Sequence, residues 1–330
     1  MSEKNNFDFI RLLAATTVLL SHQFPLMGLT EIAPLPGNSY GSLAVAVFFV
    51  ISGYFVSQSW IHDPNIWRFI AKRLLRLIPG LAGVTLFAIL VVGPLVTSYS
   101  LDEYFSNKDT WKFLSNIYLK IRFELPGVFI SNSYPKAVNG SLWSLPLEAK
   151  WYGILAVLGL LRILKFKFLL MGVFTLTFSW VYAYSHPGTS QSIDYLWYFG
   201  LFFLAGMILS SIEISKKIFL GSLLIGCLAI YIGFWLTGIV IALPIAVIYF
   251  GRMSTPPICN LDKIGDISYG VYLFAFPVQQ TVVHFLGANH SYMTLASISV
   301  FITYLFALVS WKLLELPCLS LKKYFKPLVK

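Results

Sequence analysis

Apolar segments long enough to cross a bilayer follow one another along almost the whole chain. A transmembrane helix needs about 20 consecutive apolar residues to span a hydrocarbon core of about 30 Å. Gly238 and Pro244 interrupt the seventh and eighth segments, which are also compatible with a hairpin of short helices. The pattern predicts an all-α polytopic membrane bundle of about ten transmembrane helices, at residues 7–27, 42–61, 78–97, 140–161, 168–185, 195–212, 218–235, 237–250, 266–286 and 292–314.

The composition supports this class of protein and excludes others. Only 12% of the 330 residues are charged and 57% are hydrophobic, whereas an ordinary soluble domain has roughly 25% charged residues. So few charges do not cover a soluble surface, which excludes a soluble enzyme and a disordered protein. The segments between the apolar stretches are short. We therefore expect residues 1–330 to form a single integral membrane domain without a fused soluble domain.

Basic residues are distributed unevenly between alternate connecting segments. If the N-terminus is cytoplasmic, 18 of the 24 Lys and Arg residues lie on the cytoplasmic side, and five lie in segment 98–138 on the opposite side. Cytoplasmic segments of membrane proteins carry such an excess. The asymmetry predicts that both termini are cytoplasmic. In a membrane protein the net charge of +10 reflects this orientation, and we expect no nucleic-acid partner.

The first apolar segment contains ionisable side chains that lipid would disfavour. Asp8 and Arg11 are three residues apart and can form an ion pair on a helix. Arg11 and His22 share a helix face and are separated by about 16 Å along the axis. Such residues usually face the interior of a bundle and serve a function. The alternatives are that Arg11 reaches the cytoplasmic interface and that His22 bonds a backbone carbonyl.

A pair of arginines follows the second apolar segment. Arg73 and Arg76 are three residues apart, so on a helix they present two guanidinium groups on one face. Two such groups can bind phosphates bidentately, which Lys does less specifically. The alternative is a basic anchor that contacts anionic lipid.

Polar residues also surround the start of the fourth and ninth segments. Glu148 follows Asn139, Ser141 and Trp143, and a buried carboxylate is neutral, paired or functional. A structural ion pair of Glu148 with an Arg or Lys is the alternative to a functional role. At the start of the ninth segment, we expect Asp266 and Ser268 to cap the helix, and Glu315 to pair with a basic segment. The cysteines and histidines are too dispersed to predict a metal site.

Short motifs occur in a fixed order from about Asn6 to Pro317. They are Asp8-x-x-Arg11 followed by His22; Gly41-Ser42-Leu43-Ala44-Val45 with Phe48-Phe49-Val50-Ile51-Ser52-Gly53-Tyr54; Arg73-x-x-Arg76 with Pro79; Leu142-Trp143-Ser144-Leu145-x-x-Glu148; and Gly265-Asp266-x-Ser268-Tyr269-x-x-Tyr272-Leu273 with Glu315-x-Pro317. In this order they resemble acyltransferase family 3, the integral membrane acyltransferases that O-acetylate bacterial surface polysaccharides. One departure is Ala275, which stands where many members have a His.

The resemblance implies a membrane O-acyltransferase of a bacterial inner membrane. The donor would be cytoplasmic acetyl-CoA or another acyl-CoA, and no metal would be required. The acceptor would be a hydroxyl of a cell-surface or lipid-linked glycan, and the implied partners are membrane lipid and proteins of polysaccharide biosynthesis. His22 would act as general base, and Glu148 would orient it as in a catalytic triad.

The other site residues also follow from the resemblance. Arg11, Arg73 and Arg76 would bind the phosphates of the donor. The supporting residues would be Asp8 and three candidates for stabilising the oxyanion, namely Asn139, Ser141 and Trp143. Direct transfer and a covalent acyl group on His22 or a serine are both compatible with these residues. A transporter or flippase for a lipid-linked sugar is the alternative function, since it also needs buried charges and broken helices.

Overall fold

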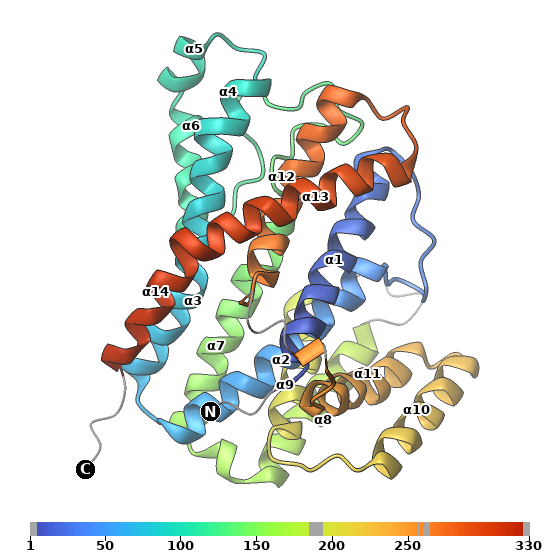
Figure 1. Cartoon of the computed structure of the whole chain (residues 1–330). Coiled ribbons are helices and arrows are strands. Elements are labelled where there is room, and N and C mark those ends of the chain that lie inside the picture. The colour runs from blue at the N-terminus through green and yellow to red at the C-terminus, as the bar shows by residue number, and fades with distance from the viewer. Residues whose placement is uncertain (1–4, 185–193, 257, 260–264, 326–330) are drawn as a thin grey trace.

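Every regular element in the described part of the chain is a helix (Figure 1). The structure is a computed structural model that describes residues 5–184, 194–256, 258–259 and 265–325. The all-α prediction is therefore confirmed for these residues. The α-helices are α1 (Phe7–Leu26), α2 (Tyr40–His62), α3 (Ile66–Phe87), α4 (Gly93–Val96), α5 (Leu101–Ser106), α6 (Lys108–Lys112), α7 (Ser144–Leu160), α8 (Lys167–Tyr184), α9 (Tyr195–Leu209), α10 (Lys216–Tyr231), α11 (Trp235–Arg252), α12 (Ser268–Leu286), α13 (Tyr292–Ser310) and α14 (Leu316–Ser320).

Each predicted apolar segment overlaps one of the longer helices. The bounds differ most for α3. Helix α3 begins at Ile66, twelve residues before the predicted start, because Asn65 caps it by accepting a hydrogen bond from the backbone N–H of Arg68. The segment with Arg73 and Arg76 is therefore helical. Five stretches of the described chain are long and apolar enough to cross a membrane, at Phe7–Leu26, Tyr40–His62, Ile66–Val96, Trp235–Arg252 and Tyr292–Phe325.

Two of these stretches are continued by π-helical turns. Residues Ala88–Val92 join α3 to α4, and residues Trp311–Glu315 join α13 to α14. Such turns are rare and often occur at functional sites. The turn at Trp311–Glu315 buries the Glu315 carboxylate, which accepts a hydrogen bond from Ser310 at 2.9 Å. Among the described residues Glu315 forms no direct ion pair, but its carboxylate interacts electrostatically with Arg76, which belongs to the basic segment.

The centre of the bundle is built from α1, α2, α9 and α12 (Figure 1). Helix α1 packs against both α2 and α12, and α2 packs against α9. Small residues allow α2 and α9 to approach closely: a Cβ on Gly53 of α2 would collide with the backbone of Phe203, and a Cβ on Gly206 of α9 would collide with the backbone of Val50. Close contact through small residues is typical of helix pairs in membranes.

We expect Gly53→Ala to destabilise the protein by about 1–3 kcal/mol, the usual cost of overpacking a core. The added methyl group meets backbone atoms of α9, so the two helices must separate to accept it. Thermal unfolding in detergent would measure the effect. Gly153→Ala is the matched control because nothing lies within 4 Å of its added Cβ. Equal melting temperatures of the two variants would contradict the close α2–α9 packing.

Residues 97–138 form a small packed unit at the end of α4. Tyr104 and Phe113 are buried against Ile89 and Val92 of the adjoining π turn, and the Tyr104 hydroxyl donates to the Ile89 carbonyl at 3.0 Å. A capping box at Ser100 and Glu103 begins α5. This segment is therefore folded onto the helical bundle.

Candidate functional site

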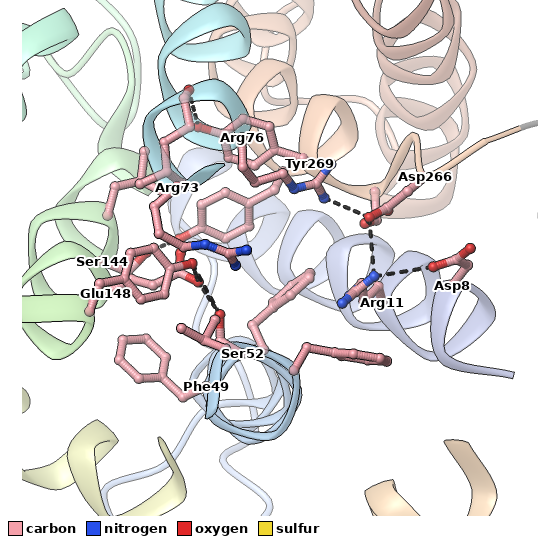
Figure 2. Close-up of a pocket in the computed structure, with 18 of the residues that line it drawn as sticks. Asp8, Arg11, Phe49, Ser52, Arg73, Arg76, Ser144, Glu148, Asp266 and Tyr269 are labelled. Atoms are coloured by element: carbon pink, nitrogen blue, oxygen red, sulfur yellow. Dashed lines mark hydrogen bonds and ion pairs between the residues drawn. The ribbon is translucent and has the colours of Figure 1, made fainter. Parts of the chain in front are cut away.

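The largest concentration of charged side chains lines a cavity beside the N-terminal half of α1. The cavity has a volume of about 470 Å³. Its charged residues come from segments far apart in sequence, and Figure 2 shows several of them around one space. Four are basic and three are acidic: Arg11, Arg73, Arg76 and Lys322, with Asp8, Glu148 and Asp266.

Asp266 joins two of the basic residues at one side of this cavity. Its carboxylate pairs with Arg76 at 2.6 Å and with Arg11 at 3.3 Å, and Arg11 also pairs with Asp8 at 3.1 Å (Figure 2). Ser268 donates a hydrogen bond to Asp266. Ile267 stands at the cap position of α12 and provides no side-chain cap, but the Asp266 carboxylate accepts from the backbone N–H of Ser268, the first residue of the helix. Asp266 also holds Arg11 of α1 and Arg76 of α3 together.

Arg73 differs from the other two arginines in its partners. No described carboxylate forms an ion pair with it, and its buried Nε has no hydrogen-bond partner. Its guanidinium carbon lies 5.8 Å from the ring centre of Tyr152 and 5.9 Å from that of Phe69, distances at which rings attract cations. In Figure 2 its guanidinium points into the cavity. Arg73 is therefore placed to receive an anion.

Glu148 lies on the same cavity, on α7. It accepts hydrogen bonds from Ser52 of α2 and from Tyr152, the latter at 2.6 Å (Figure 2). Tyr152 is one turn further along α7, so this pair has the usual i,i+4 spacing. Among the described residues Glu148 makes no ion pair with Arg or Lys, and Lys150 is exposed. The alternative of a structural ion pair is therefore wrong.

His22 lies on a second cavity, also of about 470 Å³, beside the C-terminal half of α1. Its Nδ1 is 3.4 Å from the Ser141 hydroxyl, and its ring meets Phe276 edge-on at a centroid distance of 5.5 Å. The expectation that Glu148 orients His22 is wrong, because the hydrogen bonds of Glu148 go to Ser52 and Tyr152. The alternative that His22 bonds a backbone carbonyl is also wrong, because its described partner is a serine hydroxyl.

The three candidates for oxyanion stabilisation are placed differently from one another. The Asn139 amide donates to the Leu273 carbonyl at 2.9 Å and its oxygen accepts from the backbone N–H of Ser141, so it is used in the fold. Ser141 is the partner of His22. Trp143 lines the His22 cavity. Of the three, Trp143 lines the cavity that His22 lines, and Ser141 is buried beside His22 without lining it.

The two cavities meet at Val45 and Tyr272, which line both of them. The Tyr272 hydroxyl is fixed by the Ser144 hydroxyl at 2.6 Å and by the Ser141 carbonyl at 2.8 Å. The charged cavity and the His22 cavity therefore lie on the two sides of this pair of residues. Val45 and Tyr272 therefore form the wall that the two cavities share.

Several lining residues were not predicted as site residues. Ser52, Tyr152 and Tyr272 are neutral, and such side chains resemble core residues in an apolar sequence. Lys322, near the C-terminus, also lines the charged cavity and belongs to none of the motifs. No group of three His, Cys, Asp or Glu side chains suitable for a metal occurs within residues 5–184, 194–256, 258–259 and 265–325.

Comparison with known proteins gives matches along nearly the whole chain. The family model of an acyltransferase domain matches residues 4–312. An O-acetyl transferase of Shigella phage Sf6 is 32% identical, with 96% of each chain covered. Nodulation protein 10 of Rhizobium leguminosarum bv. viciae is 28% identical over 97% of this chain and 94% of its own length.

A third relative is a putative membrane-bound transacylase, BcsY, of Komagataeibacter xylinus. It is 27% identical over 84% of this chain and 73% of its own length. No solved structure matches the chain.

Proposed function

Because the chain belongs to the family of this acyltransferase domain, we propose that it is a membrane O-acyltransferase that uses acyl-CoA as donor. The acyl group is most simply acetyl, and the acceptor is a hydroxyl of a cell-surface or lipid-linked glycan. The observation that carries the proposal is a pair of cavities that share Val45 and Tyr272 in their walls, one rich in arginine and one lined by His22.

The charged cavity suits the donor. Coenzyme A is a phosphorylated head on a long thin arm, and guanidinium groups bind phosphates through two parallel hydrogen bonds. Arg73 offers a guanidinium without an ion pair to a described carboxylate. Arg76 and Arg11 share Asp266, so they add less net positive charge. The arm then extends past Val45 and Tyr272 and brings its thioester to His22.

Transfer needs a base for the acceptor hydroxyl. A neutral His22 nitrogen takes the hydroxyl proton while the acceptor oxygen attacks the thioester carbonyl. The carbon–sulfur bond then breaks, and the imidazolium returns the proton to the departing coenzyme A thiolate. Ser141, 3.4 Å from Nδ1, holds the ring in place. Glu148 acts from the donor side, where it fixes Ser52 and Tyr152.

The reaction requires a defined orientation in a bacterial inner membrane. We propose about ten transmembrane helices with both termini in the cytoplasm, as the distribution of Lys and Arg indicates. The N-terminal half of α1, beside the charged cavity, then faces the cytoplasm, where acyl-CoA is made. The C-terminal half with His22 lies toward the outside.

We expect a single cysteine at Ser106, but not one at His62, to react with a membrane-impermeant thiol reagent on intact cells. Both side chains are exposed on the structure, and they lie in segments proposed for opposite sides. Cys227, Cys259 and Cys318 are first replaced by serine. Labelling of both positions after lysis is the control for reactivity. Labelling of the His62 position on intact cells would show that the orientation is the reverse of the one proposed.

The proposed function as a whole is tested by the surface glycans of cells. A strain that lacks this protein should have glycans without the O-acyl group that the parent strain carries, and mass spectrometry measures this difference. Expression of the chain should restore the group, and expression of the His22→Ala variant should not. Identical glycans in the deletion and parent strains would overturn the proposal.

A further inference from the structure

The described residues that line the His22 cavity carry no acidic or basic side chain apart from His22, unlike those of the donor cavity. Their side chains are apolar, aromatic, hydroxyl-bearing or amide. A phosphate or carboxylate entering it would lose water and gain no cationic partner there, which is unfavourable. The occupant of this cavity is therefore expected to be neutral.

One wall of the cavity is aromatic. The Trp143 ring lies 5.2 Å from the ring of Tyr195 and 5.5 Å from that of Phe199, measured between centroids. Phe199 is buried and Tyr195 is 56% exposed, so the wall has a fixed inner part and an open edge. Trp143 and Tyr195 also carry an N–H and an O–H, so they combine an apolar face with a polar edge.

Another part of the lining is polar and held in position. Asn38 is buried; its side-chain oxygen accepts hydrogen bonds from Tyr198 at 2.6 Å and from Ser42 at 3.3 Å. The Ser39 hydroxyl caps α2 by accepting from the Ser42 backbone N–H at 3.0 Å. The cavity thus presents an aromatic face and a set of fixed amide and hydroxyl groups. This combination is typical of a small-molecule site with few convergent polar groups.

We propose that the His22 cavity binds one neutral sugar ring of the acceptor glycan. The ring lies with an apolar face against Trp143 and Tyr195, and its hydroxyls meet the amide and hydroxyl groups around Asn38. One hydroxyl then points to His22, which takes its proton. This inference rests on the proposed function and adds to it the class of the acylated sugar, which is neutral and not a uronic or sialic acid.

The experiment uses the purified full chain, acetyl-CoA, and the lipid-linked glycan extracted from a strain that lacks this protein. We expect Trp143→Ala to raise the KM for the glycan by about 10-fold, on the order expected for an aromatic contact. Its affinity for coenzyme A should change less than about 2-fold, since Trp143 does not line the donor cavity. Trp143→Phe, which keeps an aromatic face, should recover most of the loss.

The control is Trp67→Ala, because Trp67 is 78% exposed on α3 and lines neither cavity. An unchanged glycan KM in Trp143→Ala, or an equal loss of coenzyme A affinity, would overturn this inference while wild-type transfer still supports the proposed function. Acylation of an acidic sugar, identified by mass spectrometry of the product, would also overturn it. Absence of any transfer by the wild-type protein would instead refute the proposed function itself.

Discussion

His22→Ala is expected to lower the rate of acyl transfer by about 10²–10⁴-fold, the usual contribution of a general base. The side chain is half-buried and makes one long contact, 3.4 Å to Ser141, and one edge contact with Phe276. Its removal therefore costs little packing, and the variant should insert and bind coenzyme A normally. The measurement is the rate of coenzyme A release with saturating acceptor glycan, beside a coenzyme A titration.

A second histidine provides the control for this prediction. His284 on α12 donates a hydrogen bond from Nδ1 to the Asn132 side-chain oxygen at 3.1 Å and lines neither cavity. His284→Ala should keep a rate within about 3-fold of wild type. A nearly normal rate of acyl transfer by His22→Ala would show that His22 is not the general base, whatever the coenzyme A affinity of the variant.

Arg73→Ala is expected to weaken coenzyme A binding by about 10- to 100-fold, since a hydrogen bond to a charged group contributes about 1.5–3 kcal/mol. No described carboxylate forms a direct ion pair with Arg73, so its guanidinium N–H groups are open to a phosphate. Arg73→Lys should recover only part of the affinity, because Lys lacks the planar fork. Calorimetry at fixed salt measures these affinities.

Arg76→Ala should also weaken binding, but its effect has a second source. It leaves the partly buried Asp266 with Arg11 as its remaining arginine partner, so a loss of stability accompanies the loss of charge. Thermal unfolding separates the two effects. If Arg73→Ala and Arg76→Ala both bind coenzyme A with unchanged affinity, the arginine pair does not bind the donor. Its role would then be that of an anchor for anionic lipid.

Arg68→Ala is the control for these variants. Arg68 lies on the same helix but pairs with Asp63, at 2.5 Å, and does not line the charged cavity. The hydrogen bonds from Arg68 lower the pKa of the Asp63 carboxyl to about 2, so this pair remains ionised at any ordinary assay pH. Its loss should leave the coenzyme A affinity within about 2-fold of wild type.

The longer helices were predictable from the sequence because each corresponds to an apolar segment about as long as a membrane span. The start of α3 was missed by twelve residues, because Arg68, Lys72, Arg73 and Arg76 read as a basic connecting segment. In the structure, α3 continues through these residues, and its Asn65 cap is the signal that marks its start.

For Arg11, Arg73 and Arg76, the sequence motifs predicted only a shared role in donor binding. They did not predict which residues hold these arginines together. The residue that joins two of them, Asp266, was assigned to a helix cap because its position before Ser268 fits one. Its pairing with Arg11 spans 255 residues of sequence, and no local pattern reports such a contact. The wrong pairing of Glu148 with His22 has the same cause, since only the packing of α2 against α7 gives Glu148 its partner Ser52.

The most direct test of the central claim is acetyl transfer by the purified protein in liposomes. The reaction contains acetyl-CoA with a labelled acetyl group and the lipid-linked glycan of a strain that lacks the protein. We predict that label appears in the glycan, that one coenzyme A thiol is released for each acetyl group transferred, and that the His22→Ala variant gives neither product. Movement of the glycan across the bilayer without thioester consumption would contradict the claim and would identify a transporter of a lipid-linked sugar.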